Sequence, residues 1–151
     1  MAKELEYKYL VDKSKWELLE KGTPQLIVQG FLHNTEELVI RIRIKDHQGF
    51  LTLKGKSVGI SRSEFEYEIP LEDAHEIIDQ FTDKHIRKYR YEIIHQDKKW
   101  EVDVFEEKLS GLIIAELEVA SEDEVFMKPD WATKDVSTDP NYFNAVLIQK
   151  C

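Results

Sequence analysis

Charged and apolar residues alternate with a period of two along most of the chain. In the first such segment, at residues 3–11, Glu4, Glu6 and Lys8 alternate with bulky apolar side chains. Because successive side chains of a strand point to opposite faces, each segment presents one charged face and one apolar face. The alternation predicts eight strands, near residues 3–11, 25–33, 37–45, 49–56, 61–70, 85–96, 98–107 and 112–120. Short polar links between them are typical of hairpins, so we expect antiparallel neighbours.

Three stretches with helical periodicity interrupt the strands. One follows Asp12 or Ser14, one covers residues 72–81, and one starts at Asp139-Pro140. Eight strands with tight links favour a closed barrel, which removes the sheet edges. If the helices cover the apolar outer face, the charged faces point into the barrel. We therefore predict an α+β fold with a single domain over residues 1–151, an eight-stranded antiparallel β-barrel with helices packed outside.

The charged rows separate by sign. The acidic rows contain Glu4, Glu6, Glu64, Glu66, Glu101, Asp103, Glu116 and Glu118, and the basic rows contain Lys8, Arg41, Arg43, Lys54, Arg62, Lys88 and Arg90. Desolvating an unpaired charge costs several kcal/mol, so a lumen lined by these residues must be wet, internally paired, or filled by ions or a ligand. The segregation indicates a site for a polyanion and a metal, although a self-paired network would show the same balance.

Composition excludes several classes of function. The net charge of −9 argues against a general nucleic-acid binder, because such domains are usually basic. No stretch approaches the roughly 20 apolar residues of a membrane span, and the N-terminus runs directly into the first strand. The only cysteine, Cys151, excludes an internal disulfide and a cysteine-based metal cluster. We expect a cytoplasmic protein without membrane or nucleic-acid partners, and either a monomer or a homodimer.

Taken in order, the charged blocks resemble those of a known family. Glu4-x-Glu6-x-Lys8 looks like the signature of the CYTH superfamily, the triphosphate tunnel metalloenzymes. Further blocks match in order along nearly the whole chain, namely Arg41-Ile42-Arg43, Thr52-Leu53-Lys54, Arg62-Ser63-Glu64-Phe65-Glu66, Lys88-Tyr89-Arg90-Tyr91, Trp100-Glu101-Val102-Asp103-Val104-Phe105 and Gly111-Leu112-Ile113-Ile114-Ala115-Glu116-Leu117-Glu118. A lone E-x-E-x-K is a weak signal, whereas seven ordered blocks are specific. The chain is most similar to the short bacterial inorganic triphosphatases.

The resemblance implies a tunnel that binds a small-molecule triphosphate with Mg²⁺ or Mn²⁺ and hydrolyses or cyclises it. By this analogy the metal ligands are Glu4, Glu6, Glu64, Glu66, Glu116 and Glu118, with Asp103 as a further candidate. The residues that bind phosphate oxygens are Lys8, Arg41, Arg43, Lys54, Arg62, Lys88 and Arg90. We expect the catalytic residues to be Glu4, Glu6, Lys8 and Lys88.

Metal-dependent hydrolysis of inorganic tripolyphosphate is the leading functional hypothesis. Class IV adenylyl cyclases and thiamine or nucleoside triphosphatases would use the same charged lumen and differ in what accommodates the organic group. A non-catalytic polyphosphate- or nucleotide-binding module is a further alternative, although both acidic pairs are intact. One departure from the family pattern is Phe31, where many relatives have Tyr, so a hydroxyl that could bind phosphate is absent.

Overall fold

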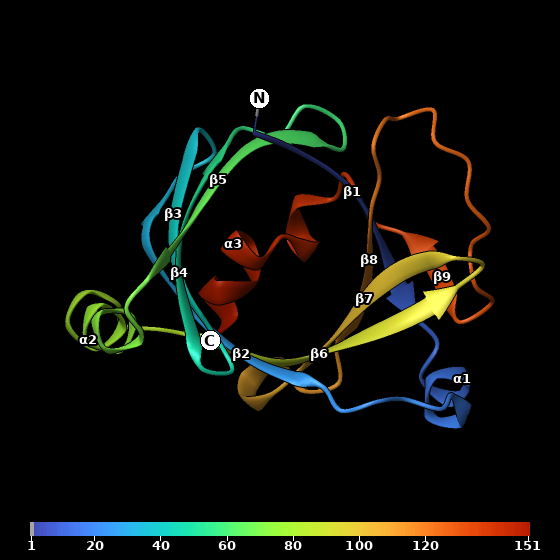
Figure 1. Ribbon diagram of the computed structural model, residues 1–151, viewed down its shortest axis with the longest axis horizontal. Helices are drawn as coiled ribbons and strands as arrows, with labels where there is room; N and C mark the ends of the chain where they lie inside the picture. Colours follow the sequence, from blue (N-terminus) through green and yellow to red (C-terminus); the bar gives the residue numbers. More distant parts are fainter. Residues whose placement is uncertain (1) are drawn as a thin grey trace.

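The strands form a closed antiparallel barrel. The structure, a computed structural model, describes residues 2–151. Its strands are β1 (Lys3–Val11), β2 (Gln25–Asn34), β3 (Leu38–Lys45), β4 (Gln48–Gly55), β5 (Ser61–Ile69), β6 (Ile86–His95), β7 (Lys98–Phe105), β8 (Ile113–Glu118) and β9 (Ala132–Asp135). The order β5-β4-β3-β2-β6-β7-β8-β1 closes through a β5–β1 pairing, and the strands encircle a central space (Figure 1). The predicted eight-stranded barrel and strand positions are confirmed.

Strand β1 connects the two ends of this sheet. Near its start Glu4 lies opposite Arg62 of β5, and further along Lys8 lies opposite Glu116 of β8. The C-terminal part of β1 also pairs with β9, a strand that the sequence analysis did not predict. Because β9 has only four residues, alternation within it gives too short a signal.

Two helices pack on the outside of the barrel, as expected. Helix α1 (Lys13–Leu18) is capped by Asp12, whose Oδ1 accepts a hydrogen bond from the backbone N–H of Lys15 at 3.0 Å. Helix α2 (Leu71–Phe81) lies against β3 and β4 through the buried Ala74. Gly49 allows this close approach, because a Cβ there would lie 2.7 Å from the Cβ of Ala74. Within residues 2–151, no helix is long and apolar enough to cross a bilayer.

An aromatic cluster covers the outer face of β1, β7 and β8. Trp100 is fully buried, and its ring centroid lies 5.9 Å from that of Trp131, which in turn lies 6.3 Å from that of Trp16. Tilted and edge-to-face contacts of this kind stabilise a core beyond the area that they bury. The three tryptophans therefore support the barrel wall that carries Glu6 and Glu116 on its opposite face.

The C-terminal segment has a different place from the other helices. It comprises a 3-10 turn (Pro140–Tyr142), helix α3 (Asn144–Leu147) and a second 3-10 turn (Ile148–Lys150), and the strands surround it in Figure 1. Leu147 and Ile148 pack against a set of lumen-facing apolar residues, Ile86, Phe105 and Ile114. The segment thus fills an apolar end of the lumen.

Candidate functional site

The charged faces of the strands meet in a cavity inside the barrel. Its volume is about 190 Å³, and it is lined by Glu4, Glu6, Lys8, Arg41, Arg43, Lys45, Lys54, Glu64, Glu66, Arg90, Glu101, Glu116, Glu118 and Asn144. Seven of these side chains are acidic and six are basic, so the cavity is close to neutral, and apart from Lys8 on β1 each strand contributes charges of one sign. An arrangement of this kind can hold an anion on one wall and a cation on the other.

Most of the residues predicted for the site line this cavity, with three exceptions. Lys88 and Asp103 are fully buried and belong to an ion-pair cluster. Arg62 lines a neighbouring cavity, and its Nε and Nη2 donate hydrogen bonds to the backbone carbonyl of Gly55 at 3.1 and 2.9 Å. The period-two pattern therefore predicted the face of the strand on which Lys88, Asp103 and Arg62 lie. It does not predict the position of each side chain along the barrel axis.

The wall formed by β1 and β8 is acidic. The register places Glu6 opposite Glu118 and Lys8 opposite Glu116. Burial raises the pKa of Glu6 well above its ordinary value, and the charges of Glu116 and Glu4 raise it further. The charge of Lys8, whose Nζ lies 3.9 Å from Glu6 Oε1, lowers the pKa of Glu6 but does not outweigh these causes. This wall therefore favours the binding of a proton or of a cation.

Lys54 holds two of the carboxylates. Its Nζ lies 3.2 Å from an oxygen of Glu4 and 3.2 Å from an oxygen of Glu64. Burial raises the pKa of Glu4, but the charge of Lys54 and hydrogen bonds from Glu6 and Lys54 outweigh it and bring the pKa to about 2. Glu4 is therefore ionised at neutral pH, and its partner can be exchanged for another cation.

The donor chemistry of the acidic wall fits a hard divalent cation. Carboxylate oxygens are the ligands that Mg²⁺ and Mn²⁺ prefer in proteins. Across residues 2–151, however, no group of three or more acidic, His or Cys side chains is gathered closely enough to form a metal site. The ion pairs give the reason, since Lys54 separates Glu4 from Glu64. The glutamates are therefore suitable ligands for a divalent cation, but Glu4 and Glu64 can bind it only if Lys54 moves to other partners.

The opposite wall is cationic and partly unsatisfied. Arg41 is only 4 % exposed, and within the described residues its Nε has no hydrogen-bond partner. Its Nη2 lies 3.3 Å from Thr52 Oγ1 and 3.7 Å from Glu66 Oε2. Burial and the neighbouring charge of Arg43 lower the pKa of Arg41 to about 9, yet it remains charged at neutral pH. A buried guanidinium with a free N–H is suited to an anionic oxygen.

Outside the cavity lining, the carboxylate of Asp103 forms ion pairs with two basic side chains, Arg90 and Lys88. Arg90 donates from Nε to Oδ1 at 2.7 Å and from Nη2 to Oδ2 at 2.9 Å, and Lys88 Nζ lies 2.7 Å from Oδ2. Although burial alone raises the pKa of Asp103, the charges of Arg90 and Lys88 bring it well below its usual range. Since both oxygens are engaged, we assign Asp103 to the support of Arg90 and Lys88 and leave it out of the proposed metal site.

Lys88 makes its contacts away from the cavity. Its ammonium group is shielded from solvent, forms an ion pair with Asp103, and donates a hydrogen bond to Asn144 Oδ1 at 3.0 Å. Burial lowers the pKa of Lys88 to about 7 despite the opposing charge of Asp103. In this arrangement the lysine reaches the cavity through Asn144.

Some residues of the site were not predicted from the sequence. Lys45 continues the alternation of Arg41 and Arg43 by one more step, so the pattern contained that signal. Asn144 is neutral and lies on the C-terminal segment, where a strand pattern gives no indication. Phe31 packs with the apolar cluster around Leu147, so the position where relatives often have Tyr supports the C-terminal segment here.

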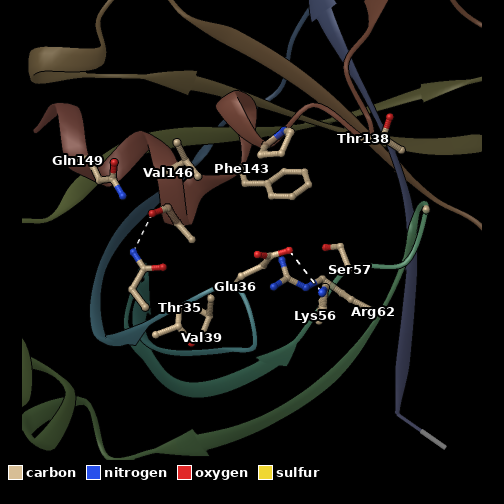
Figure 2. A pocket seen from close by; sticks show the side chains of 14 residues that line it. Thr35, Glu36, Val39, Lys56, Ser57, Arg62, Thr138, Phe143, Val146 and Gln149 are labelled. Carbon is tan, nitrogen blue, oxygen red and sulfur yellow. Dashed lines mark hydrogen bonds and ion pairs between the residues drawn. The ribbon is translucent and has the colours of Figure 1, made fainter.

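A second cavity, of about 530 Å³, lies beside the charged one. Its walls come from the β2–β3 hairpin, the β4–β5 loop and the C-terminal segment. Figure 2 shows Phe143 and Val146 on the side of the C-terminal segment, across from Thr35 and Val39. The Phe143 ring lies 5.3 Å from Nζ of Lys8, which lines the charged cavity, so the two cavities lie close together. The accessible surface of the second cavity is mainly apolar, and three charged side chains, Glu36, Lys56 and Arg62, also line it.

Comparisons with known proteins agree with this geometry. The CYTH domain family matches residues 2–150. An inorganic triphosphatase of Acetivibrio thermocellus is 41% identical over 150 residues, which cover 99% of this chain and 95% of the relative. An inorganic triphosphatase of Nitrosomonas europaea is 32% identical over 123 residues, or 79% of this chain and 81% of the relative.

Solved structures give the same result. The crystal structure of an inorganic triphosphatase superposes with a TM-score of 0.68 at 28% identity, covering 98% of this chain and 95% of the other. A conserved hypothetical protein of Pyrococcus furiosus superposes with a TM-score of 0.59 at 20% identity, covering 80% of each chain. At that level of identity the second likeness shows the fold alone.

Proposed function

The chain belongs to the CYTH domain family, and from this premise we propose that it hydrolyses inorganic tripolyphosphate to phosphate and pyrophosphate in its charged cavity. The names of the two relatives support this substrate. The observation that carries the proposal is the buried Arg41, whose Nε has no partner within residues 2–151, on a wall that faces clustered glutamates. Such a site has an unused donor for an anion, and carboxylates that can exchange a lysine partner for a metal cation.

Each wall has its own role in this proposal. Arg41 and Arg43 bind phosphate oxygens, because planar guanidinium groups match them in two-pronged geometry. Lys8, Lys54 and Arg90 contribute further positive charge along the cavity. When a phosphate chain enters, Lys54 can turn to it and release Glu4 and Glu64. Binding of the anion and of a cation would therefore support each other.

The carboxylates hold the metal in this proposal. We assign this role to Glu4 and Glu6 on β1, Glu64 and Glu66 on β5, and Glu116 and Glu118 on β8. Glutamates at alternate positions of one strand point the same way, so each pair can reach one ion or two adjacent ions. When bound, Mg²⁺ or Mn²⁺ neutralises phosphate oxygens and lowers the pKa of a water molecule for attack on the terminal phosphorus. The protein's own part is positioning and charge stabilisation, which dominate phosphoryl transfer.

Removal of divalent metal is expected to abolish the reaction. The assay measures phosphate and pyrophosphate released from tripolyphosphate in EDTA, then after addition of Mg²⁺ or Mn²⁺ in excess. We expect no turnover in EDTA and full recovery with at least one of the two ions, because the glutamates bind the triphosphate only through a cation. Undiminished hydrolysis in EDTA would contradict the proposed roles of all six glutamates.

Hydrolysis of organic triphosphates is a second candidate function, favoured by the apolar cavity of Figure 2. The ring of Phe143, on the lining of this cavity, lies 5.3 Å from Nζ of Lys8, which lines the charged cavity, so a nucleoside or thiamine group could occupy the first while its phosphates lie in the second. Arg62 would then contact the bridging phosphate or the organic group.

Filling this cavity distinguishes the two substrates. Val146→Trp is expected to lower kcat/KM for ATP by about tenfold, the effect of a badly fitting group in an apolar pocket, and to leave tripolyphosphate hydrolysis within about twofold. Val125→Trp is the matched control, because Val125 is 87% exposed and lies outside both cavities. An equal loss for both substrates in Val146→Trp would remove the apolar cavity from the substrate site.

A further inference from the structure

Asn144 connects the C-terminal segment to the buried polar groups of the tunnel. Its Oδ1 accepts a hydrogen bond from Lys88 Nζ at 3.0 Å and another from Gln29 Nε2 at 3.0 Å. Both donors are fully buried. Among the described residues, Asn144 is the one residue of α3 whose side chain hydrogen-bonds to the tunnel wall.

The two donors are themselves held in place. Lys88 is fixed by Asp103 at 2.7 Å, and the Oε1 of Gln29 accepts a hydrogen bond from Arg43 Nε at 3.1 Å. With both acceptor positions of its oxygen filled, the amide of Asn144 has a fixed orientation. Within residues 2–151 the hydrogen bonds of this amide all end on Oδ1, while the side chain lines the charged cavity. The amide nitrogen is therefore a donor available to the cavity.

We propose that Asn144 is a phosphate-binding residue, whose Nδ2 donates to an oxygen of the bound triphosphate while Lys88 and Gln29 fix its oxygen. This inference rests on the proposed function and adds a residue to that site. It also assigns a role to Lys88, which positions Asn144 from behind the wall. Because the amide is neutral, Asn144 adds a directed hydrogen-bond donor to a cavity whose other donors are the charged groups of Lys and Arg.

The position of Asn144 couples substrate binding to the C-terminal segment. The backbone carbonyl of the next residue, Ala145, accepts a hydrogen bond from Asn34 Nδ2 at 2.7 Å, and Leu147 packs in the apolar end of the lumen. A phosphate oxygen bound to Nδ2 adds a contact between this segment and the ligand. Occupancy of the cavity should therefore stabilise α3 in its place.

The test is Asn144→Asp. This variant keeps an oxygen for Lys88 and Gln29, but replaces the donor that faces the cavity with a second oxygen that repels phosphate. We expect the Kd of an imido-bridged, non-hydrolysable tripolyphosphate analogue, measured by calorimetry with Mg²⁺, to rise roughly tenfold to a hundredfold, and KM for tripolyphosphate to rise with it. The thermal midpoint of the unliganded protein should stay within a few degrees of the wild type.

Asn141→Asp is the matched control, because it makes the same chemical change on the same segment at an exposed position outside the charged cavity. It should keep wild-type Kd and KM. Hydrogen exchange of residues 144–151 gives a second readout: the analogue should slow exchange in the wild type and much less in Asn144→Asp.

The outcomes separate the inference from the function on which it rests. Wild-type affinity and KM in Asn144→Asp, with an active wild-type enzyme, would overturn the role of Asn144 alone. A wild-type protein that neither binds the analogue nor hydrolyses tripolyphosphate would overturn the proposed function, and this inference with it. A wild-type protein that binds the analogue without turnover still tests Asn144 through the Kd.

Discussion

Glu6→Gln is expected to lower tripolyphosphate hydrolysis by at least about a hundredfold while it leaves the fold intact. Loss of a residue that merely orients a metal ligand typically costs 10–100-fold, so loss of a proposed ligand should cost at least as much. The fold should tolerate the change, because the raised pKa of Glu6 means that a neutral side chain already suits this position without metal. Gln is the neutral isostere of the protonated carboxyl group.

The measurement is kcat/KM with saturating Mg²⁺ or Mn²⁺, together with the thermal midpoint. Glu68→Gln is the control, since Glu68 lies on the lumen-side row of β5 but is exposed and does not line the cavity. Near-wild-type turnover in Glu6→Gln would remove Glu6 from the proposed metal ligands. A large fall in thermal midpoint without metal would instead assign Glu6 a structural role.

Asp103→Asn is expected to destabilise the barrel by about 3–5 kcal/mol, the usual cost of breaking a buried ion pair by removing one partner. The variant leaves Lys88 without its closest counter-ion at a position that is fully buried. Arg90 keeps one neutral acceptor oxygen at position 103 and the longer ion pairs to Glu101 at 3.4 Å and to Glu116 at 3.8 Å. Urea unfolding gives the free energy of unfolding from the midpoint and slope.

The pH dependence of this difference follows from the pKa of Asp103. Its folded-state pKa is depressed, so the carboxylate contributes its full stabilisation above its unfolded pKa of about 3.9 and loses it as the pH falls below that value. The gap between wild type and Asp103→Asn should therefore narrow below about pH 4. Asp97→Asn, in the exposed β6–β7 turn, should match the wild type at every pH. Equal stabilities of Asp103→Asn and wild type at pH 7 would show that the cluster is not a source of stability.

The alternation of charge and bulk predicted the barrel because period two reports directly which side chains share a face. It gave the strands, the inward orientation of the charges and most residues of the cavity. It could not predict that Asp103 and Lys88 pair with each other, because alternation fixes the face and leaves the depth along the barrel open. Alternation also could not predict that Arg62 lies outside the charged cavity. Its guanidinium group donates hydrogen bonds to the backbone carbonyl of Gly55.

The place of the C-terminal segment was also beyond the sequence pattern. An apolar stripe shows that a helix must be covered, but it does not say by which surface. Leu147 is buried inside the lumen, where it packs against Ile86 and Phe105. These two apolar residues lie on the same strand faces as the charged side chains. These apolar residues at one end of charged strands are the signal that could have predicted a segment inserted there.

The position of β1 has a consequence for how the protein acquires its activity. This first strand carries Glu4, Glu6 and Lys8, yet its partners are β5, β8 and β9, the last of them at residues 132–135. On a ribosome, the first strand cannot complete these pairings until residues 132–135 have been made. Pairings so distant in sequence are associated with slow folding. The tunnel should therefore close only after β8 has been made, and nascent chains that end before β8 should lack a closed tunnel and its activity.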